Sequence, residues 1–296
     1  MAYKILYIDD QETSSREADL RNLGFEIIPH KPTNNFKAIE EKVRSGIDAI
    51  ILDYKLTEGE GEQACFDAPT IAQFVRTMHS SDGFSIPVVL MSNQEIFTEN
   101  YNNDYTSQDL FDFTITKQYF TDNQKSFGKK LNSFIEVYKK IKSDNSLYKS
   151  LNIRESDVHL HSRFVSAFKK YIPNLEKKQK LNQFNISSLI YDDLLCSISL
   201  TIGEDFLSAR LGVSKESNDW NKLLNSLEET LYLGVFSDIK KRWWMEKVNK
   251  WWSETISSET TLRRLNAVER VALLKTKLNL DLIPLEKTKH SVSSNF

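Results

Sequence analysis

Four short apolar runs in this chain each end on a polar side chain. The runs are KILYIDD at 4–10, IDAIILD at 47–53, PVVLMS at 87–92 and FDFTITK at 111–117. Short apolar runs that alternate with helical patterns are typical of the strands of a parallel α/β sheet. Ligands bind in the crevice outside the carboxyl ends of such strands. The sequence therefore predicts a doubly wound parallel sheet with a polar site at one edge.

The residues at these strand ends suit a divalent cation and a phosphoryl group. Asp9 and Asp10 close the first run, and Asp53 closes the second. Three hard carboxylate oxygens suit Mg²⁺, which keeps several waters and takes one or two carboxylates directly. Ser92 and Lys117 close the other two runs and supply a hydroxyl and an ammonium group that can hold phosphoryl oxygens. The chemistry that this set implies is phosphoryl transfer.

This order of residues, over 1–142, resembles the CheY-like receiver domain of two-component response regulators. The resemblance implies a (βα)5 doubly wound sheet, with Asp53 as the phosphoacceptor and as a Mg²⁺ ligand beside the acidic pair. It implies that Ser92 and Lys117 sense the phosphoryl group and that a histidine kinase donates it. Autophosphorylation and autodephosphorylation are then the only turnover expected. The alternative is a degenerate receiver that acts as a docking module without a phosphoryl adduct.

Four positions depart from the receiver pattern. Thr57 stands where the loop after the phosphoacceptor usually has proline, and Asn93 stands where a small residue is usual. Thr114 replaces the switch aromatic, and Gln118 replaces the proline that commonly follows the lysine. Phe113 is adjacent to Thr114 but should face the other way, because strand side chains alternate. We expect intact chemistry and an altered aromatic switch.

The length of 296 residues indicates a second domain after the receiver. Helical spacing of apolar residues predicts an all-α output domain at 150–285, after a polar linker at 143–149 and before a disordered tail at 286–296. No apolar run is long enough to span a bilayer, and no amino-terminal signal is visible. We therefore expect a cytoplasmic protein without a membrane partner.

The strongest feature of the second half is KKRWWMEKVNKWWSE at 240–254, whose four tryptophans recur at i, i+1, i+8 and i+9. On a helix, this spacing brings both pairs to one side. One interpretation is a core-facing stripe, and the other is an exposed partner surface with a basic edge. The residues of that expected surface are Lys240, Lys241, Arg242, Trp243, Trp244, Trp251 and Trp252. We expect an output that acts through protein contacts, with homodimer formation as a further expectation.

A DNA-binding transcriptional regulator is an alternative. SARLGVSKESNDWNKLL resembles a helix-turn-helix, with Gly212 at the turn and Ser214 capping the next helix. Asn218 and Asn221 stand where the second helix should bury apolar residues. The charges of residues 144–296, 23 basic against 19 acidic, give only +4. Nucleic acid is therefore not the favoured partner.

A phosphorylation-gated effector enzyme such as a nuclease is a further alternative. The spacing of Arg154 and His159 resembles the R-x4-6-H motif of HEPN-type ribonucleases, but this short motif is frequent by chance. A second set comprises the acidic pairs 192–193 and 204–205 with His159 and His161. Adjacent residues point in different directions on a helix, so solvated charge is the favoured interpretation of this set.

Overall fold

The computed structural model describes residues 2–57, 64–78, 85–144, 147–154, 157, 182–198, 200–257 and 259–286. The chain divides into two compact units, of which the first comprises Met1–Leu147 with Ile172–Leu189. The second comprises Tyr148–Tyr171 with Ile190–Phe296. His159, His161 and residues 287–296 lie outside the described residues.

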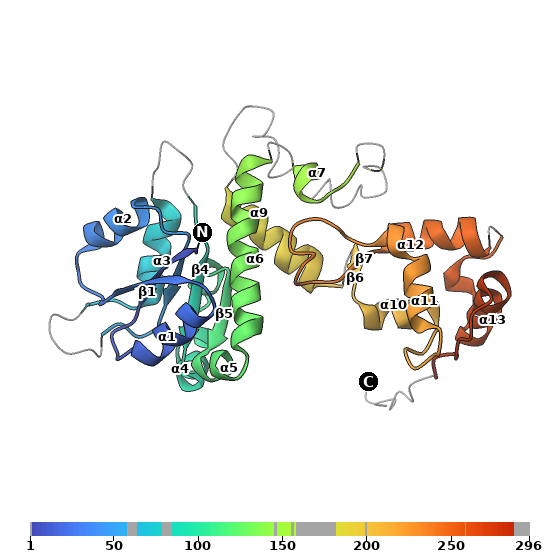
Figure 1. Cartoon of the computed structure of the whole chain (residues 1–296), viewed down its shortest axis with the longest axis horizontal. Coiled ribbons are helices and arrows are strands. Elements are labelled where there is room, and N and C mark those ends of the chain that lie inside the picture. The colour runs from blue at the N-terminus through green and yellow to red at the C-terminus, as the bar shows by residue number, and fades with distance from the viewer. Residues whose placement is uncertain are drawn as a thin grey trace, which may run out of the picture. The chain divides into compact units, whose positions relative to one another are not determined.

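A sheet of five parallel strands forms the centre of the first unit, in the order β2-β1-β3-β4-β5 (Figure 1). The strands are β1 Lys4–Ile8, β2 Glu26–His30, β3 Ala49–Leu52, β4 Val88–Ser92 and β5 Phe113–Thr116. This is one of the two common doubly wound orders, and its ligand crevice lies where the winding reverses, between β1 and β3. The predicted fold class is therefore confirmed, and the four apolar runs contain β1, β3, β4 and β5.

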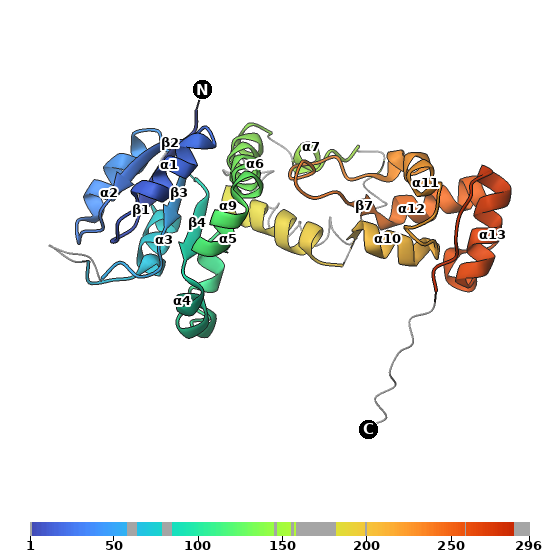
Figure 2. The same ribbon diagram turned by 60° about the horizontal axis from the view of Figure 1, so that its bottom comes forward.

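Helices connect the strands and cover both faces of the sheet (Figure 2). The helices are α1 Ser14–Asn22, α2 Phe36–Arg44, α3 Ala68–Thr77, α4 Gln94–Glu99, α5 Lys117–Asp122 and α6 Gln124–Ser143. Two 3-10 turns, η1 Tyr101–Asn103 and η2 Gln108–Leu110, follow the short helix α4. No helix formed by the described residues combines the length and the apolar character that crossing a membrane requires.

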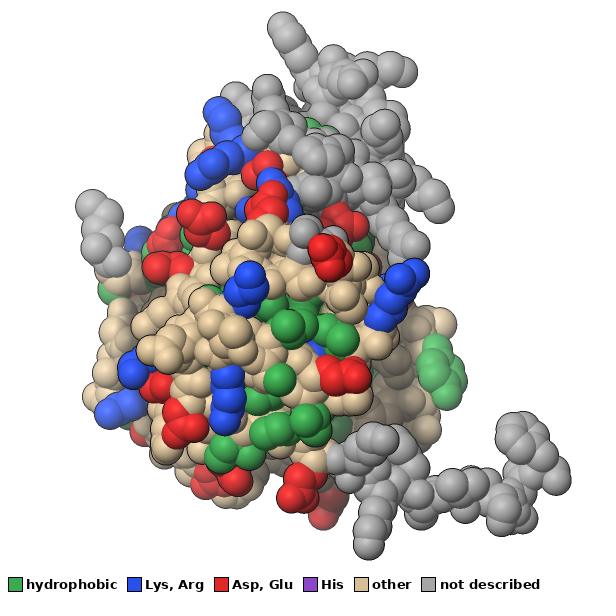
Figure 3. All heavy atoms as spheres, turned by 90° about the vertical axis from the view of Figure 1, so that its right-hand side faces the viewer, with side chains coloured by type: hydrophobic (Ala, Val, Ile, Leu, Met, Phe, Trp, Pro, Cys, Tyr) green, Lys and Arg blue, Asp and Glu red, His purple; other side chains and the backbone are tan. Residues whose placement is uncertain are grey.

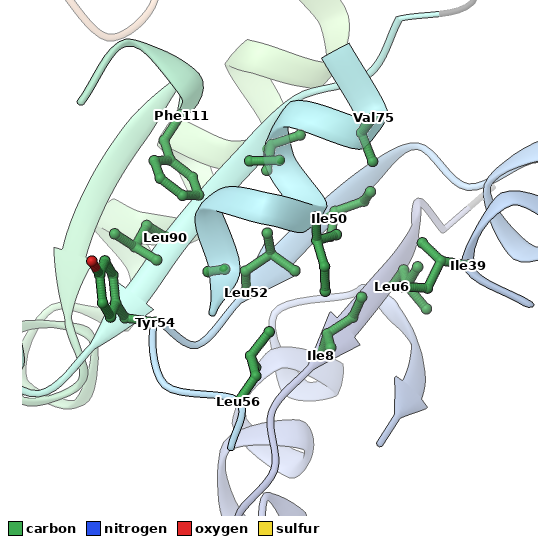
Figure 4. Packing of buried hydrophobic residues seen from close by; sticks show 14 of the residues in the cluster. Leu6, Ile8, Ile39, Ile50, Leu52, Tyr54, Leu56, Val75, Leu90 and Phe111 are labelled. Atoms are coloured by element: carbon green, nitrogen blue, oxygen red, sulfur yellow. The ribbon is translucent and has the colours of Figure 1, made fainter. Parts of the chain in front are cut away.

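One core layer lies between the sheet and helices α2 and α3 (Figure 4). Alternate strand residues enter it because successive side chains of a strand point to opposite faces. They include Leu6, Ile8, Ile50, Leu52 and Leu90, which meet Ile39 of α2 and Val75 of α3. Each fully buried aliphatic side chain of this kind contributes about 1.5–3 kcal/mol relative to an exposed one. This packing fixes the strand ends that carry the predicted site.

A buried ion pair joins α3 to the sheet. The guanidinium Nη2 of Arg76 lies 2.8 Å from Oδ2 of Asp112, and this oxygen also accepts the amide N–H of Val88 at 2.7 Å. The hydroxyl of Tyr138 on α6 donates to the other oxygen at 2.6 Å. The ring of Phe184 lies 3.6 Å from the Arg76 guanidinium. Phe184 belongs to α9 Gln183–Ser188, so a segment beyond the expected boundary at 142 packs on the first unit.

We expect Arg76→Met to lower the free energy of unfolding of the first unit by about 3–5 kcal/mol, because Asp112 would keep a buried charge without its counter-ion. Hydrogen exchange in peptides of β4 would measure this loss. The matched control is Arg44→Met, since Arg44 forms an exposed i, i+4 pair with Glu40 and should contribute only about 0.3–0.5 kcal/mol. Equal losses in the two variants would contradict the role of the buried pair.

The described residues of the second unit are mainly helical, as predicted, and they include a short antiparallel ribbon of strands β6 Thr201–Ile202 and β7 Trp243–Trp244. Gly212 ends α10 in the left-handed conformation. Asn266 and Glu269 form a capping box at the start of α13. The helices and turns are α7 Leu147–Ser150, α10 Glu204–Leu211, α11 Trp220–Ser226, η5 Glu228–Thr230, α12 Met245–Trp251, η7 Leu262–Arg264 and α13 Ala267–Leu278, with π-helical segments at Leu189–Cys196 and Trp252–Ile256.

The four clustered tryptophans do not lie on one helix, which corrects the expectation from their spacing. Trp243 and Trp244 form β7, and only Trp251 belongs to α12. The exposed fractions of Trp243, Trp244 and Trp252 are 0%, 2% and 1%. The interpretation of these three rings as an exposed partner surface is therefore wrong, because they are core residues of the second unit.

The basic edge beside these tryptophans is partly engaged within the second unit. Arg242 Nη2 donates to the carbonyl of Ser197 at 2.7 Å. The ammonium of Lys240 lies 5.7 Å from the centre of the Tyr191 ring. Lys241 is exposed, although its ammonium lies 5.2 Å from the centre of the buried Trp243 ring. The expected continuous surface of basic and aromatic residues is thus reduced to the exposed part of Lys241 and its neighbours.

We expect Trp252→Ala to lower the free energy of unfolding of the second unit by about 3–5 kcal/mol, because it leaves a cavity in the core. It also removes the bond from the indole N–H to the carbonyl of Thr260, which is 2.9 Å long. The matched control is Trp251→Ala, because Trp251 is half-buried and its loss should cost less. Tryptophan fluorescence during denaturant unfolding would report this unit alone, since all five tryptophans lie in it. A larger loss of unfolding free energy in Trp251→Ala than in Trp252→Ala would contradict the assignment of Trp252 to the core.

Candidate functional site

Four strand ends bring the five predicted site residues together. Ser92 Oγ donates to Asp53 Oδ1 at 2.6 Å, and Lys117 Nζ lies 2.5 Å from Asp53 Oδ2. The same ammonium lies 3.1 Å from Oδ2 of Asp9. One carboxylate oxygen from each of Asp9, Asp10 and Asp53 lies within 4.8 Å of the others. The convergence expected from the strand ends is thus present, while the role of each residue remains a prediction.

The local backbone places these side chains. The amide of Asp53 donates to the carbonyl of Ile8 at 2.9 Å, which aligns the ends of β1 and β3. The hydroxyl of Thr116 accepts the amide N–H of Tyr119 at 3.0 Å and caps α5. A Thr N-cap satisfies one of the unpaired donors of a helix start. Lys117 is therefore the first residue of α5, with its ammonium at the carboxylates.

Burial and neighbouring charges shift the pKa values of Asp53 and Asp9 in opposite directions. Burial raises the pKa of Asp53, and the charge of Asp9 raises it further, while Lys117 and Ser92 oppose this shift only in part. Burial also acts to raise the pKa of Asp9, but Lys117, the amide of Gln11 and Arg16 outweigh it and hold that pKa below its ordinary value. Asp9 is therefore the firmly ionised member, and Asp53 is the carboxylate whose charge costs more to maintain.

Two further residues at the site, Tyr7 and Arg16, were not predicted. The hydroxyl of Tyr7 donates to Asp9 Oδ2 at 3.1 Å, and Arg16 Nη2 lies 3.2 Å from the same oxygen. A residue two positions before Asp9 on the same strand shares its face, which could have identified Tyr7. An arginine in the first turn of the following helix is a weaker signal, because that position is commonly solvated.

The acidic triad suits Mg²⁺ chemically. Its three carboxylates are hard oxygen donors, and each residue is buried, with exposed fractions of 3% for Asp9, 7% for Asp10 and 5% for Asp53. Mg²⁺ usually takes one or two such carboxylates and keeps several waters. Among the described residues, this triad is the one cluster of three or more acidic, histidine or cysteine side chains placed to share a metal ion. The second predicted acidic set does not form such a cluster there.

Thr114 and Phe113, the two residues at the expected switch position, differ in their surroundings. Thr114 is exposed and lines a hollow of about 410 Å³ beside Gln94 and Tyr119. Phe113 also lines this hollow, but it is buried, and its ring centre lies 4.9 Å from that of Phe134 on α6. The contrast between a buried Phe113 and an exposed Thr114 agrees with the alternation expected for neighbours on a strand.

The turn after α10 differs from the expected helix-turn-helix. Gly212 has a φ of 71° and ends α10, but α11 begins only at Trp220, with Asp219 at its N-cap position. Ser214 Oγ instead accepts the amide of Glu216 at 3.2 Å, so the expected capping role of Ser214 is wrong. On the face drawn in Figure 3, acidic and basic side chains of the described residues are interspersed, without the single-sign stripe typical of DNA-binding proteins.

The strand order gives the first unit the fold of a CheY-like receiver domain, and the five predicted residues lie together at the carboxyl ends of its strands. No protein-family model matches the chain, and no curated protein matches it. Among solved structures, 108 chains match.

The matches include receiver domains that span 46% or less of this chain. One is the receiver domain of a sensor histidine kinase from Pseudomonas aeruginosa with a magnesium ion in its active-site cleft, at 16% identity over 46% of this chain and 99% of that chain, with a TM-score of 0.35. Another is a response regulator receiver domain protein from Clostridium thermocellum, at 16% identity over 46% and 97%, with a TM-score of 0.36. A third is a response regulator protein from Thermotoga maritima in complex with Mg²⁺–BeF, at 21% identity over 44% and 98%, with a TM-score of 0.32.

We expect Asp53→Asn to increase the free energy of unfolding of the first unit at pH 7. Because the pKa of Asp53 is raised on folding, ionising it opposes folding above its unfolded pKa of about 3.9. The gain should therefore be absent at low pH, grow as the pH rises through the folded pKa, and then stay constant. Hydrogen exchange in peptides of β1 and β3 would measure it, and a gain that is equal at acidic and neutral pH would contradict this origin.

Proposed function

We propose that this protein is a two-component response regulator, phosphorylated on Asp53 by a histidine kinase with Mg²⁺. The observation that carries the proposal is the position of Asp53 in the crevice of the sheet. One of its oxygens accepts from Ser92 and the other from Lys117, and two further carboxylates lie beside it. Charged and polar groups at such a switch point are the usual means by which this kind of sheet binds phosphoryl groups.

The reaction is a transfer between two nucleophiles. A carboxylate oxygen of Asp53 attacks the phosphorus of a phosphohistidine, the P–N bond breaks, and the imidazole nitrogen keeps the electron pair. The product is an acyl phosphate on Asp53 and a free histidine on the kinase. Mg²⁺, when bound by the triad, supplies positive charge to the equatorial phosphoryl oxygens.

Lys117 and Ser92 have complementary roles in this mechanism. The Lys117 ammonium, 2.5 Å from Asp53, favours the ionised nucleophile against the effect of burial and then pairs with the phosphoryl oxygens that form there. The Ser92 hydroxyl, which donates to Asp53 at 2.6 Å, can transfer its hydrogen bond to a phosphoryl oxygen. Both groups thus change partner on phosphorylation, which gives the rest of the receiver a signal to respond to.

We infer that the second unit is the output and that it acts through protein contacts. Support comes from its large apolar side chains that remain in water, which include Phe206 at 46%, Leu233 at 60% and Val268 at 65% exposure. Aromatic and aliphatic anchors of this kind are enriched in the centres of protein interfaces. The partner is another protein or a second copy of this chain.

Intact mass after incubation with Mg²⁺ and a small phosphodonor should show one phosphoryl adduct on the wild type and none on Asp53→Asn. The matched control is Asp48→Asn, because Asp48 lies before β3 at the opposite edge of the sheet, where it accepts the amide of Lys4 at 2.9 Å. This variant should keep the adduct. Solution size measured on the same samples would show whether phosphorylation changes the assembly state.

Absence of an adduct on the wild type, with small donors and with histidine kinases, would contradict the proposed phosphorylation and favour a docking module. An adduct that persists in Asp53→Asn would place the acceptor elsewhere. An Asp53-dependent adduct without any change in solution size would retain the receiver chemistry and direct the search to partners other than a second copy.

A further inference from the structure

Arg16 places a second positive charge at the acidic triad, beside that of Lys117. It lies in the first turn of α1, and its side chain is 24% exposed, while the side chain of Asp9 that it meets is 1% exposed. Its Nη2 lies 3.2 Å from Asp9 Oδ2 and also donates to the carbonyl of Glu12 at 3.2 Å. The guanidinium therefore reaches inward from the helix to a buried carboxylate.

Tyr7 fixes this guanidinium in position. The Tyr7 hydroxyl accepts from Nε of Arg16 at 2.8 Å and donates to Asp9 Oδ2 at 3.1 Å. Tyr7 is 1% exposed and lies within β1, so the group that orients Arg16 is itself rigidly held. The arrangement differs from an ordinary surface ion pair, in which two long side chains lose entropy for little gain.

The carboxylate of Asp9 is crowded with donors as a result. Its Oδ2 faces the Tyr7 hydroxyl, the Arg16 guanidinium and, at 3.1 Å, the Lys117 ammonium. Its Oδ1 accepts the amide of Gln11 at 2.9 Å. A divalent cation at the triad needs an oxygen of Asp9, Asp10 or Asp53. The charged side chains of Arg16 and Lys117 already neutralise Oδ2 of Asp9, which is the most crowded of these oxygens. Opposite charges at such short distances interact strongly where water is largely excluded.

We propose that Arg16 is a built-in competitor for the divalent cation at this site. It holds Asp9 in the metal-free protein and raises the Mg²⁺ concentration at which the triad binds the ion. The proposal rests on the proposed function for the identity of the metal. It concerns the affinity of the unphosphorylated protein, so its test requires no phosphoryl transfer.

Titration calorimetry of Mg²⁺ into the unphosphorylated full chain tests the proposal. Arg16→Gln keeps an amide donor but removes the charge, and it should bind Mg²⁺ at least about tenfold more tightly than the wild type. Tyr7→Phe removes the group that orients Arg16 and should increase the affinity by a smaller factor. The matched control is Arg21→Gln, because Arg21 lies on the same helix but pairs with Glu17, at 2.8 Å, instead of with Asp9. This control should bind as the wild type does.

The possible outcomes separate this proposal from the proposed function. Equal affinity in the wild type and Arg16→Gln overturns the competitor role and leaves the Mg²⁺ site intact. Weaker binding in Arg16→Gln also overturns it and makes Arg16 a support of the site. Mg²⁺ binding that is measurable in Arg16→Gln and not in the wild type would support the proposal most strongly. No binding by any variant overturns the Mg²⁺ site itself, and with it the receiver chemistry proposed above.

Discussion

Three carboxylates are buried at one edge of the sheet, and the rest of the first unit is arranged around them. Burying like charges opposes folding unless cations and hydrogen-bond donors compensate them. Lys117 compensates Asp9 and Asp53 together, and Arg16 compensates Asp9 from α1. The two compensating groups come from different helices, so the site can form only when β1, β3 and the starts of α1 and α5 are all in place.

The sequence predicted the convergence of these residues because each of them lies at the carboxyl end of a strand. Once strands are recognised from apolar runs, parallel topology brings Asp9, Asp53, Ser92 and Lys117 to the same edge without further information. Arg16 could not be predicted in the same way. Its contact depends on the exact path from β1 into α1, and an arginine at a helix start is more often solvated.

The second unit was harder to predict because helical spacing does not require a helix. The spacing of the tryptophan pairs fits one side of a helix, but the chain forms β7 as far as Trp244 and begins α12 at Met245. Periodicity alone does not distinguish a short buried strand from a helix segment. Burial was nevertheless the better interpretation for Trp243 and Trp252, since large aromatic rings stabilise a core strongly.

The first unit is discontinuous in the chain, and the contact between Phe184 and Arg76 lies where its second segment packs on the first. The chain leaves the first unit after Leu147 and contributes α9 to it again before Leu189. Residues 148–171 are thus, in chain order, an insertion between the two segments of the first unit. A fragment that stops at residue 142 would lack α9 and expose the guanidinium face that Phe184 covers. A different output domain therefore cannot be fused after residue 142 without removing part of the first unit.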